Sequence, residues 1–125
     1  GEGPSLRRMR AYLEMMVYDP DLITDDIVEE RFAASMASDP SIAEGGVHRP
    51  PGEQVWRDLD RIGASTLVVW GRDNRVQGYD NALFMLNRIP DAQVHVYGRT
   101  GLWVPFERRD EFNRLVLAFL QSSAG

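Results

Sequence analysis

The sequence contains no cysteine, which excludes disulfide bonds and thiolate metal sites. Basic residues are in the minority, since 14 Lys and Arg against 19 Asp and Glu give a net charge of −5. That balance argues against a nucleic-acid backbone as a partner, because phosphate binding needs clustered basic side chains. No apolar run approaches membrane-spanning length, and no signal peptide opens the chain. We therefore expect a soluble, cytoplasmic protein that binds neither nucleic acid nor membranes.

The 125 residues are enough for one domain, with an ordinary globular share of hydrophobic side chains, 43%. The most informative stretch is Thr66–Trp70, an uncharged run of β-prone residues that stops at Gly71. Such a run predicts a strand buried on both faces. The polar residues 72–75 then follow at the carboxyl end of this strand, where open α/β sheets collect ligands and catalytic groups. An ordinary loop with solvated charges is the alternative interpretation.

Two amphipathic helices are predicted before this strand. Apolar residues at helical spacing indicate a helix over residues 6–18, with Ser5 as its N-cap. Thr24 caps a second helix, in which Arg31 falls inside the apolar arc. A guanidinium group there either extends to solvent, pairs with a nearby Glu, or meets an anionic ligand. The arc itself contains Ile27, Val28, Phe32 and Met36.

A loop rich in Gly and Pro, residues 38–52, separates these helices from the rest of the chain. We therefore expect two parts, a helical segment with its linker at residues 1–52 and a core portion at residues 53–125. His48 lies in the loop, where it is either a surface residue or a side chain that approaches a pocket.

The second part alternates helices and strands. The pattern predicts a short helix at 55–62, the strand at 66–70, a helix at 82–89, a strand at 93–97, a loop at 98–105 and a final helix at 112–120. This order implies a βαβ unit with parallel strands. Two parallel strands do not make an independent sheet, so we expect an incomplete sheet that needs a partner segment. His95, inside the second strand, is expected to be a packed residue rather than a catalytic one.

Several separate motifs resemble the C-terminal part of the α/β-hydrolase fold, and within it the meta-cleavage product hydrolases. In that family a carbon–carbon bond of ring-opened aromatic compounds is cleaved. The core motifs are Trp70-Gly71-Arg72-Asp73-Asn74-Arg75, Val94-His95-Val96-Tyr97, Gly101-Leu102-Trp103 and the run 110–116. Residues 18–24 and 30–32 are similar to the helical lid of the same group. No Gly-x-Ser-x-Gly nucleophile motif occurs, and in the family it belongs to the earlier half of the domain.

The resemblance implies a degenerate catalytic triad. The family's acidic residue corresponds to Asn74 and its histidine to Leu102, so neither position carries its catalytic group. An amide in place of the carboxylate favours the wrong imidazole tautomer, and an isobutyl group can neither accept nor donate a proton. Asp73 is adjacent but is expected to point elsewhere. Triad-type hydrolysis is therefore expected to be lost.

The binding residues implied by the resemblance are present. A lid arginine that meets the acidic end of the substrate corresponds to Arg31, and a tryptophan that lines the pocket corresponds to Trp103. Alone, Trp103 could equally be an aromatic plug for the core. Together the two residues suggest a pocket for a conjugated acid, because a planar guanidinium group suits a carboxylate or enolate. The resemblance implies no cofactor and no metal.

Three functions remain open at this point. The first is a hydrolase-like protein that binds an unsaturated acidic or polyketide-like molecule and guides a non-hydrolytic reaction such as a cyclisation. The second is an active carbon–carbon bond or ester hydrolase, with its nucleophile in the missing half and a base relocated to His48. The third is a structural subunit. In each case we expect a second chain or segment that supplies the N-terminal half of the core, or a homo-oligomer.

Overall fold

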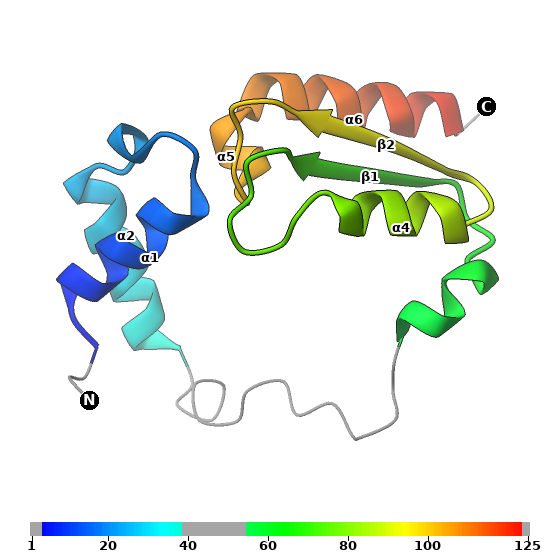
Figure 1. Ribbon diagram of the computed structural model, residues 1–125. Helices are drawn as coiled ribbons and strands as arrows, with labels where there is room; N and C mark the ends of the chain where they lie inside the picture. The colour runs from blue at the N-terminus through cyan, green and yellow to red at the C-terminus, as the bar shows by residue number, and fades with distance from the viewer. Residues whose placement is uncertain (1–3, 39–54, 124–125) are drawn as a thin grey trace.

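The computed structural model describes residues 4–38 and 55–123. A helical segment, residues 4–38, lies beside an α/β core portion, residues 55–123, and the arrowheads of both strands point toward it (Figure 1). The elements, in chain order, are α1 Leu6–Met16, η1 Pro20–Leu22, α2 Asp25–Ala37, η2 Val55–Arg61, β1 Thr66–Gly71, α4 Asp80–Arg88, β2 Ala92–Tyr97, α5 Val104–Glu107 and α6 Arg109–Ser123.

The helical segment, called the lid segment below, has a small core of its own. The hydroxyl groups of Ser5 and Thr24 cap α1 and α2 by accepting hydrogen bonds from backbone N–H groups, as predicted. Apolar side chains of α1 and α2 then pack together, with Trp103 and Phe106 of the core portion against them. The buried members are Leu13, Val17, Ile23 and Val28.

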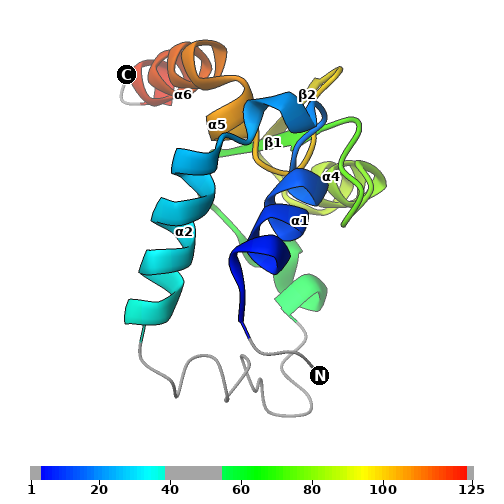
Figure 2. The same ribbon diagram turned by 90° about the vertical axis from the view of Figure 1, so that its left-hand side faces the viewer.

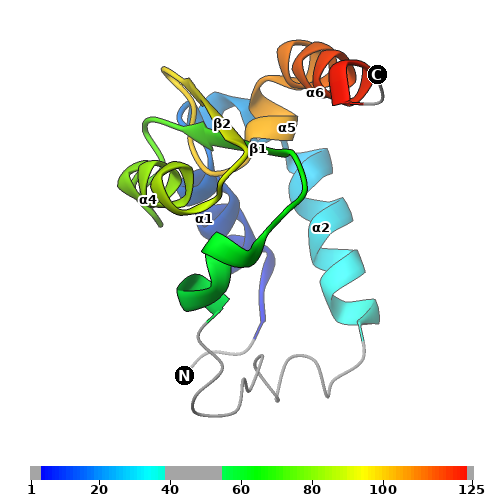
Figure 3. The same ribbon diagram turned by 90° about the vertical axis from the view of Figure 1, so that its right-hand side faces the viewer.

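The core portion is built on two parallel strands that run in register from the pair Thr66 and Ala92 to the pair Gly71 and Tyr97. Helix α4 connects them, and α4 and α6 lie on opposite sides of the sheet (Figures 2 and 3). Parallel strands need such a crossover, so the predicted βαβ unit is confirmed. The loops that follow β1 and β2 meet at the edge nearest the lid segment (Figure 1).

Burial in the sheet differs from the prediction. Within the run Thr66–Trp70 only Val68 is buried, and the other residues are half-buried. His95 is exposed rather than packed, and its ring lies 4.3 Å from that of Tyr97. A strand is buried on both faces only when neighbouring strands and helices cover it, and the described sheet has two strands.

Two short elements differ from the prediction, and a third makes it more specific. A single turn of 3₁₀ helix forms at Pro20–Leu22, where the sequence indicated only a helix end. The short helix predicted at 55–62 is present as the 3₁₀ helix Val55–Arg61. Helix α5, Val104–Glu107, begins inside the predicted loop. Met36 of the predicted apolar arc is 58% exposed, because α2 extends past the lid core at its C-terminal end. The expected boundary at residue 52 lies outside the described residues.

Candidate functional site

The carboxyl ends of β1 and β2 are joined by backbone hydrogen bonds. The N–H of Arg72 donates to the carbonyl of Tyr97 at 2.8 Å, and that of Asp73 donates to the carbonyl of Thr100 at 2.9 Å. The two loops approach so closely that a Cβ on Gly71 would lie 1.9 Å from the carbonyl oxygen of Gly101. Glycine is therefore required at Gly71, since any side chain would force the two loops apart.

This contact brings together Asn74 and Leu102, the two positions that the sequence resemblance matches to the family's acid and base. Asn74 and Leu102 line one cavity of about 100 Å³, together with Val69, Trp70, Gly71 and Val104. The arrangement is that of a site at the carboxyl edge of an α/β sheet, as expected from the sequence. The side chain of Leu102 carries no polar atom.

The amide of Asn74 is held by its own loop. Its Oδ1 accepts hydrogen bonds from the N–H groups of Val76 at 2.9 Å and Gln77 at 3.0 Å, as in an Asx turn. This network fixes which end of the amide is oxygen, so the other end is the NH2 donor. A carboxylate at this position could keep the loop contacts with one oxygen and offer the second as an acceptor. The free end of the Asn74 amide is an NH2 donor, which cannot accept a hydrogen bond from the Nδ1–H group of an imidazole.

Asp73 does not replace Asn74. Its carboxylate accepts a hydrogen bond from the N–H of Thr100 at 3.4 Å and lies 3.3 Å from the guanidinium group of Arg72. It does not line the cavity that Asn74 and Leu102 share. The expectation that this side chain points elsewhere is confirmed.

The backbone of Met16 connects this edge to the lid segment. Its carbonyl accepts hydrogen bonds from the N–H groups of Leu102 at 2.7 Å and Trp103 at 3.2 Å. A Cβ on Gly101 would lie 2.6 Å from the same carbonyl oxygen. The end of α1 is thus held directly against the loop that follows β2. These contacts fix the position of the lid segment relative to that loop.

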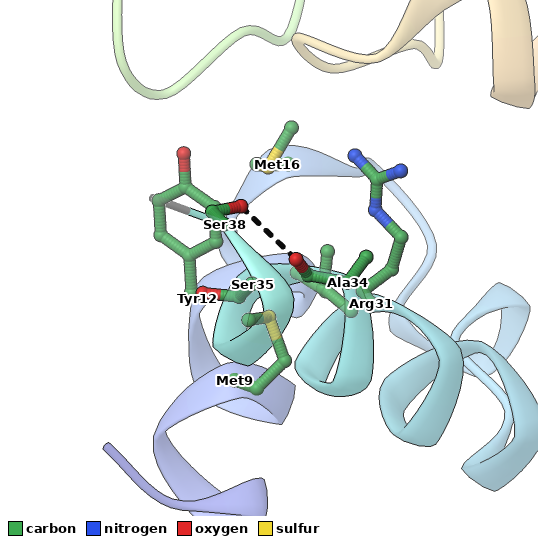
Figure 4. A pocket seen from close by; sticks show the side chains of 8 residues that line it. Met9, Tyr12, Met16, Arg31, Ala34, Ser35 and Ser38 are labelled. Atoms are coloured by element: carbon green, nitrogen blue, oxygen red, sulfur yellow. Dashed lines mark hydrogen bonds between the residues drawn. The ribbon is translucent and has the colours of Figure 1, made fainter. Parts of the chain in front are cut away.

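Arg31 lines a cleft of about 360 Å³ between α1 and α2. In Figure 4 the ring of Tyr12 and the guanidinium group of Arg31 stand on opposite sides of the cleft, with Met16 between them. The remaining wall is apolar or small, and Ser38 donates its hydroxyl hydrogen to the carbonyl of Ala34 at 3.0 Å. The other residues that line the cleft are Met9, Leu13 and Ser35.

The guanidinium group of Arg31 lies over the ring of Trp103, 5.4 Å from its centroid. Trp103 in turn stacks on Phe106, with ring centroids 4.4 Å apart. The contact of a guanidinium group with an aromatic ring is worth about 0.5–1 kcal/mol at an exposed site. It holds the guanidinium group of Arg31 against the ring of Trp103. Arg31 makes no ion pair with an acidic side chain of residues 4–38 or 55–123, so its hydrogen-bond donors remain available. Trp103 is the support under Arg31 and does not itself line the cleft.

No histidine of the described residues lines the cavity at Asn74 and Leu102 or the cleft at Arg31. His95 is exposed on β2 and lines neither cavity, and His48 lies outside the described residues. Burial, together with the carboxylate of Glu111, raises the pKa of Tyr97 above its usual value of 10.0. No group of three or more His, Asp or Glu within residues 4–38 and 55–123 is placed to hold a metal ion.

Two structural residues were missed from the sequence. Glu107 accepts hydrogen bonds from the N–H groups of Tyr18 at 2.7 Å and Gly101 at 2.9 Å, which pins the lid segment to the loop after β2. Arg108 donates to the hydroxyl of Thr100 and to the carbonyl of Gly98, both at 2.9 Å. The run 107–109 has the pattern of a charged surface turn, and only the contacts in the folded chain, above all that between Glu107 and Tyr18, reveal the role.

Comparison with solved structures places this arrangement among known folds. A meta-cleavage product hydrolase from Pseudomonas fluorescens IP01 superposes with a TM-score of 0.79 and 33% identity, over 98% of this chain and 47% of that one. The chain has the fold of the C-terminal part of an α/β-hydrolase. The 2-hydroxy-6-oxo-6-phenylhexa-2,4-dienoate hydrolase from Rhodococcus sp. strain RHA1 shares the same fold, with a TM-score of 0.71 and 24% identity over 94% of this chain and 45% of that one.

Curated relatives agree with the structural comparison. The chain is 37% identical over 123 residues to 2-hydroxy-6-oxo-6-phenylhexa-2,4-dienoate hydrolase of Burkholderia cepacia, covering 94% of this chain and 42% of that protein. It is also 37% identical over 122 residues to a 2-hydroxy-6-oxononadienedioate/2-hydroxy-6-oxononatrienedioate hydrolase of Comamonas testosteroni, again covering 42% of that protein. The chain thus spans about two fifths of the length of these relatives and matches their C-terminal part. No protein-family model matches the chain.

Proposed function

We propose that this chain is the lid and the acid–base edge of an α/β-hydrolase-like protein that binds an unsaturated acidic small molecule and has lost triad hydrolysis. The observation that carries the loss is the cavity shared by Asn74 and Leu102. Asn74 and Leu102 stand at the positions that the resemblance gives to the acid and the base, but an amide cannot replace the carboxylate and an isobutyl group cannot carry a proton. Without its base, a triad keeps only what binding and the oxyanion hole supply, about 10³–10⁴-fold over water.

Retained binding is supported by Arg31. The guanidinium group lines the cleft, is oriented by Trp103, and has no competing described carboxylate. A planar guanidinium group recognises a carboxylate or enolate through two parallel hydrogen bonds. The Burkholderia and Comamonas relatives are named as hydrolases of dienoates and dienedioates, so a conjugated acid is the ligand class we assign. A cyclisation, which needs no proton-shuttling triad, is a reaction that such a pocket could guide.

The test measures binding of a 2-hydroxy-6-oxo-dienoate to the natively purified protein by isothermal titration calorimetry. Arg31→Ala should weaken binding about 10-fold or more, the loss expected for a charge-assisted hydrogen-bond pair. Arg31→Lys should restore only part of the affinity, because the fork geometry is lost. Arg7→Ala, which removes an exposed arginine of α1, is the matched control and should bind normally.

Three outcomes would contradict the proposal. Normal binding by Arg31→Ala would remove the assigned ligand contact. Turnover of the dienoate at ordinary enzyme rates, abolished by His48→Ala, would mean that the base has moved to His48 and that the protein is an active hydrolase. Absence of dienoate binding by the unmodified protein would favour the structural-subunit alternative.

We further propose that the two-stranded sheet is completed by the N-terminal half of a hydrolase core, carried by the same polypeptide or by a second chain, or otherwise by a homo-oligomer. Large apolar side chains of the core portion are exposed among the described residues, which supports a covering partner. They include Trp56, Leu83, Leu117 and Leu120. Native mass spectrometry of the purified species identifies the source, and a cooperative, concentration-independent melt of a 125-residue monomer would reject the proposal.

A further inference from the structure

A second hollow lies between the lid segment and the loops of the core portion, separate from the Arg31 cleft. It is an open groove of about 630 Å³. One wall is formed by residues that follow α1, between Tyr18 and Leu22. The other wall is formed by the loops after β1 and β2 and by the C-terminal end of α5. The residues that line the groove are Tyr18, Asp19, Pro20, Leu22, Arg75, Arg99, Glu107 and Arg108.

Three arginines from three different loops converge on this groove, and two of them are unpaired. Arg108 is occupied by Thr100 and by the carbonyl of Gly98. Arg75 and Arg99 make no ion pair and no side-chain hydrogen bond within residues 4–38 and 55–123. Two guanidinium groups on one groove repel each other unless an anion lies between them.

The two carboxylates of the groove are outnumbered by its three arginines, so the groove keeps a net positive charge. Glu107 accepts hydrogen bonds from the backbone N–H groups of Tyr18 and Gly101, and Asp19 accepts one from Asp21. Neither carboxylate forms an ion pair with Arg75 or Arg99 within residues 4–38 and 55–123. The free donors of the groove are the guanidinium groups of Arg75 and Arg99.

Arg99 also carries backbone strain. Its φ of 52° lies in the left-handed region, and it is the sole non-glycine residue with positive φ among those described. That conformation is unfavourable for an ordinary residue, whereas glycine adopts it freely. A glycine precedes Arg99 in the same loop, so the strain falls on the residue that lines the groove.

We propose that this groove binds a small organic dicarboxylate, with its carboxylate groups at Arg75 and Arg99 and its carbon chain against the lid segment. Guanidinium groups match carboxylates in geometry. The opposite wall contributes Tyr18, Pro20 and Leu22, which favour a carbon chain over an inorganic ion. Because the two walls belong to the lid segment and to the core loops, the bound dicarboxylate bridges them. This site is distinct from the Arg31 cleft of the proposed function, since the two share no lining residue.

The experiment titrates glutarate into the natively purified protein at constant ionic strength, with acetate and phosphate as comparison ligands. Glutarate should bind more tightly than either, because acetate offers one carboxylate and phosphate has no carbon chain. Arg75→Gln and Arg99→Gly should each weaken glutarate binding about 10-fold or more. Arg99→Gly should keep the unfolding midpoint of the unmodified protein, because relief of strain offsets the added freedom of the unfolded chain.

Two matched variants separate this site from others. Arg7→Gln removes the same charge from an exposed position of α1, and Arg31→Ala empties the other cleft. Both should bind glutarate normally. The proposal is overturned if Arg75→Gln and Arg99→Gly bind normally, if Arg7→Gln weakens binding equally, or if Arg31→Ala abolishes it. Phosphate that binds as tightly as glutarate would also reject the assigned ligand class.

Discussion

The edge cavity at Asn74 and Leu102 and the lid cleft at Arg31 are built in different ways. The edge is held mainly by backbone hydrogen bonds and by glycines in close contact, with side-chain support from Asn74, Glu107 and Arg108. The cleft depends on side chains, since Arg31 is oriented by Trp103 and Trp103 by Phe106. We therefore expect the edge to keep its shape when a side chain outside this support, such as that of Leu102, is replaced, whereas replacement of Arg31 or Trp103 should remove the binding geometry of the cleft.

The largest expected effect is a gain of chemistry at the edge. The double change Asn74→Asp and Leu102→His should raise hydrolysis of a dienoate or activated ester by at least about 10³-fold, provided that the N-terminal half carries a nucleophile. Asn74→Asp alone should do nothing, and Leu102→His alone should recover little, because the residues of a triad act as a unit. Rates are measured by the loss of dienoate absorbance. Equal activity of the single and double variants would show that the edge is not a preserved triad frame.

The glycines at the edge should resist substitution most strongly. Gly71→Ala should lower the free energy of unfolding by more than about 3 kcal/mol, because its Cβ would overlap the carbonyl oxygen of Gly101 at 1.9 Å. Gly63→Ala is the matched control, since nothing lies within 4 Å of its Cβ. Urea unfolding of the natively purified protein measures both. A tolerated alanine at Gly71 would mean that side chains, not the backbone, set this edge.

The smallest effect concerns the loop function of Asn74. Asn74→Ala removes the acceptor of two backbone N–H groups and should cost about 1–2 kcal/mol of stability. Asn74→Asp keeps that acceptor and should change stability by less than about 0.5 kcal/mol. Thermal unfolding of the two variants measures the contribution of the Asn74 hydrogen bonds to stability, separately from any catalytic effect. A loss of stability in Asn74→Asp as large as that in Asn74→Ala would contradict the assigned hydrogen bonds.

Several features of the fold follow from local sequence pattern alone. The N-caps Ser5 and Thr24, the parallel strands and their crossover helix were all predicted, because caps, apolar periodicity and strand propensity are local properties. The similarity to meta-cleavage product hydrolases was also predicted from motifs and is confirmed by the relatives found. Arg31 was singled out because its charge interrupts an apolar arc, and it does line the cleft. A role for Arg31 and Trp103 in ligand binding stays a prediction.

By itself the sequence determined the order of helices and strands, the charge balance, and the residue types at the edge and in the lid. The tertiary structure alone decided which backbone groups meet: that Met16 accepts hydrogen bonds from Leu102 and Trp103, and that Glu107 holds Tyr18. It also decided the exposure of His95 and the groove shared by Arg75 and Arg99. The physical reason is that these contacts join residues far apart in the chain. Their geometry depends on how the lid segment and the two strand-end loops pack, which no local periodicity encodes.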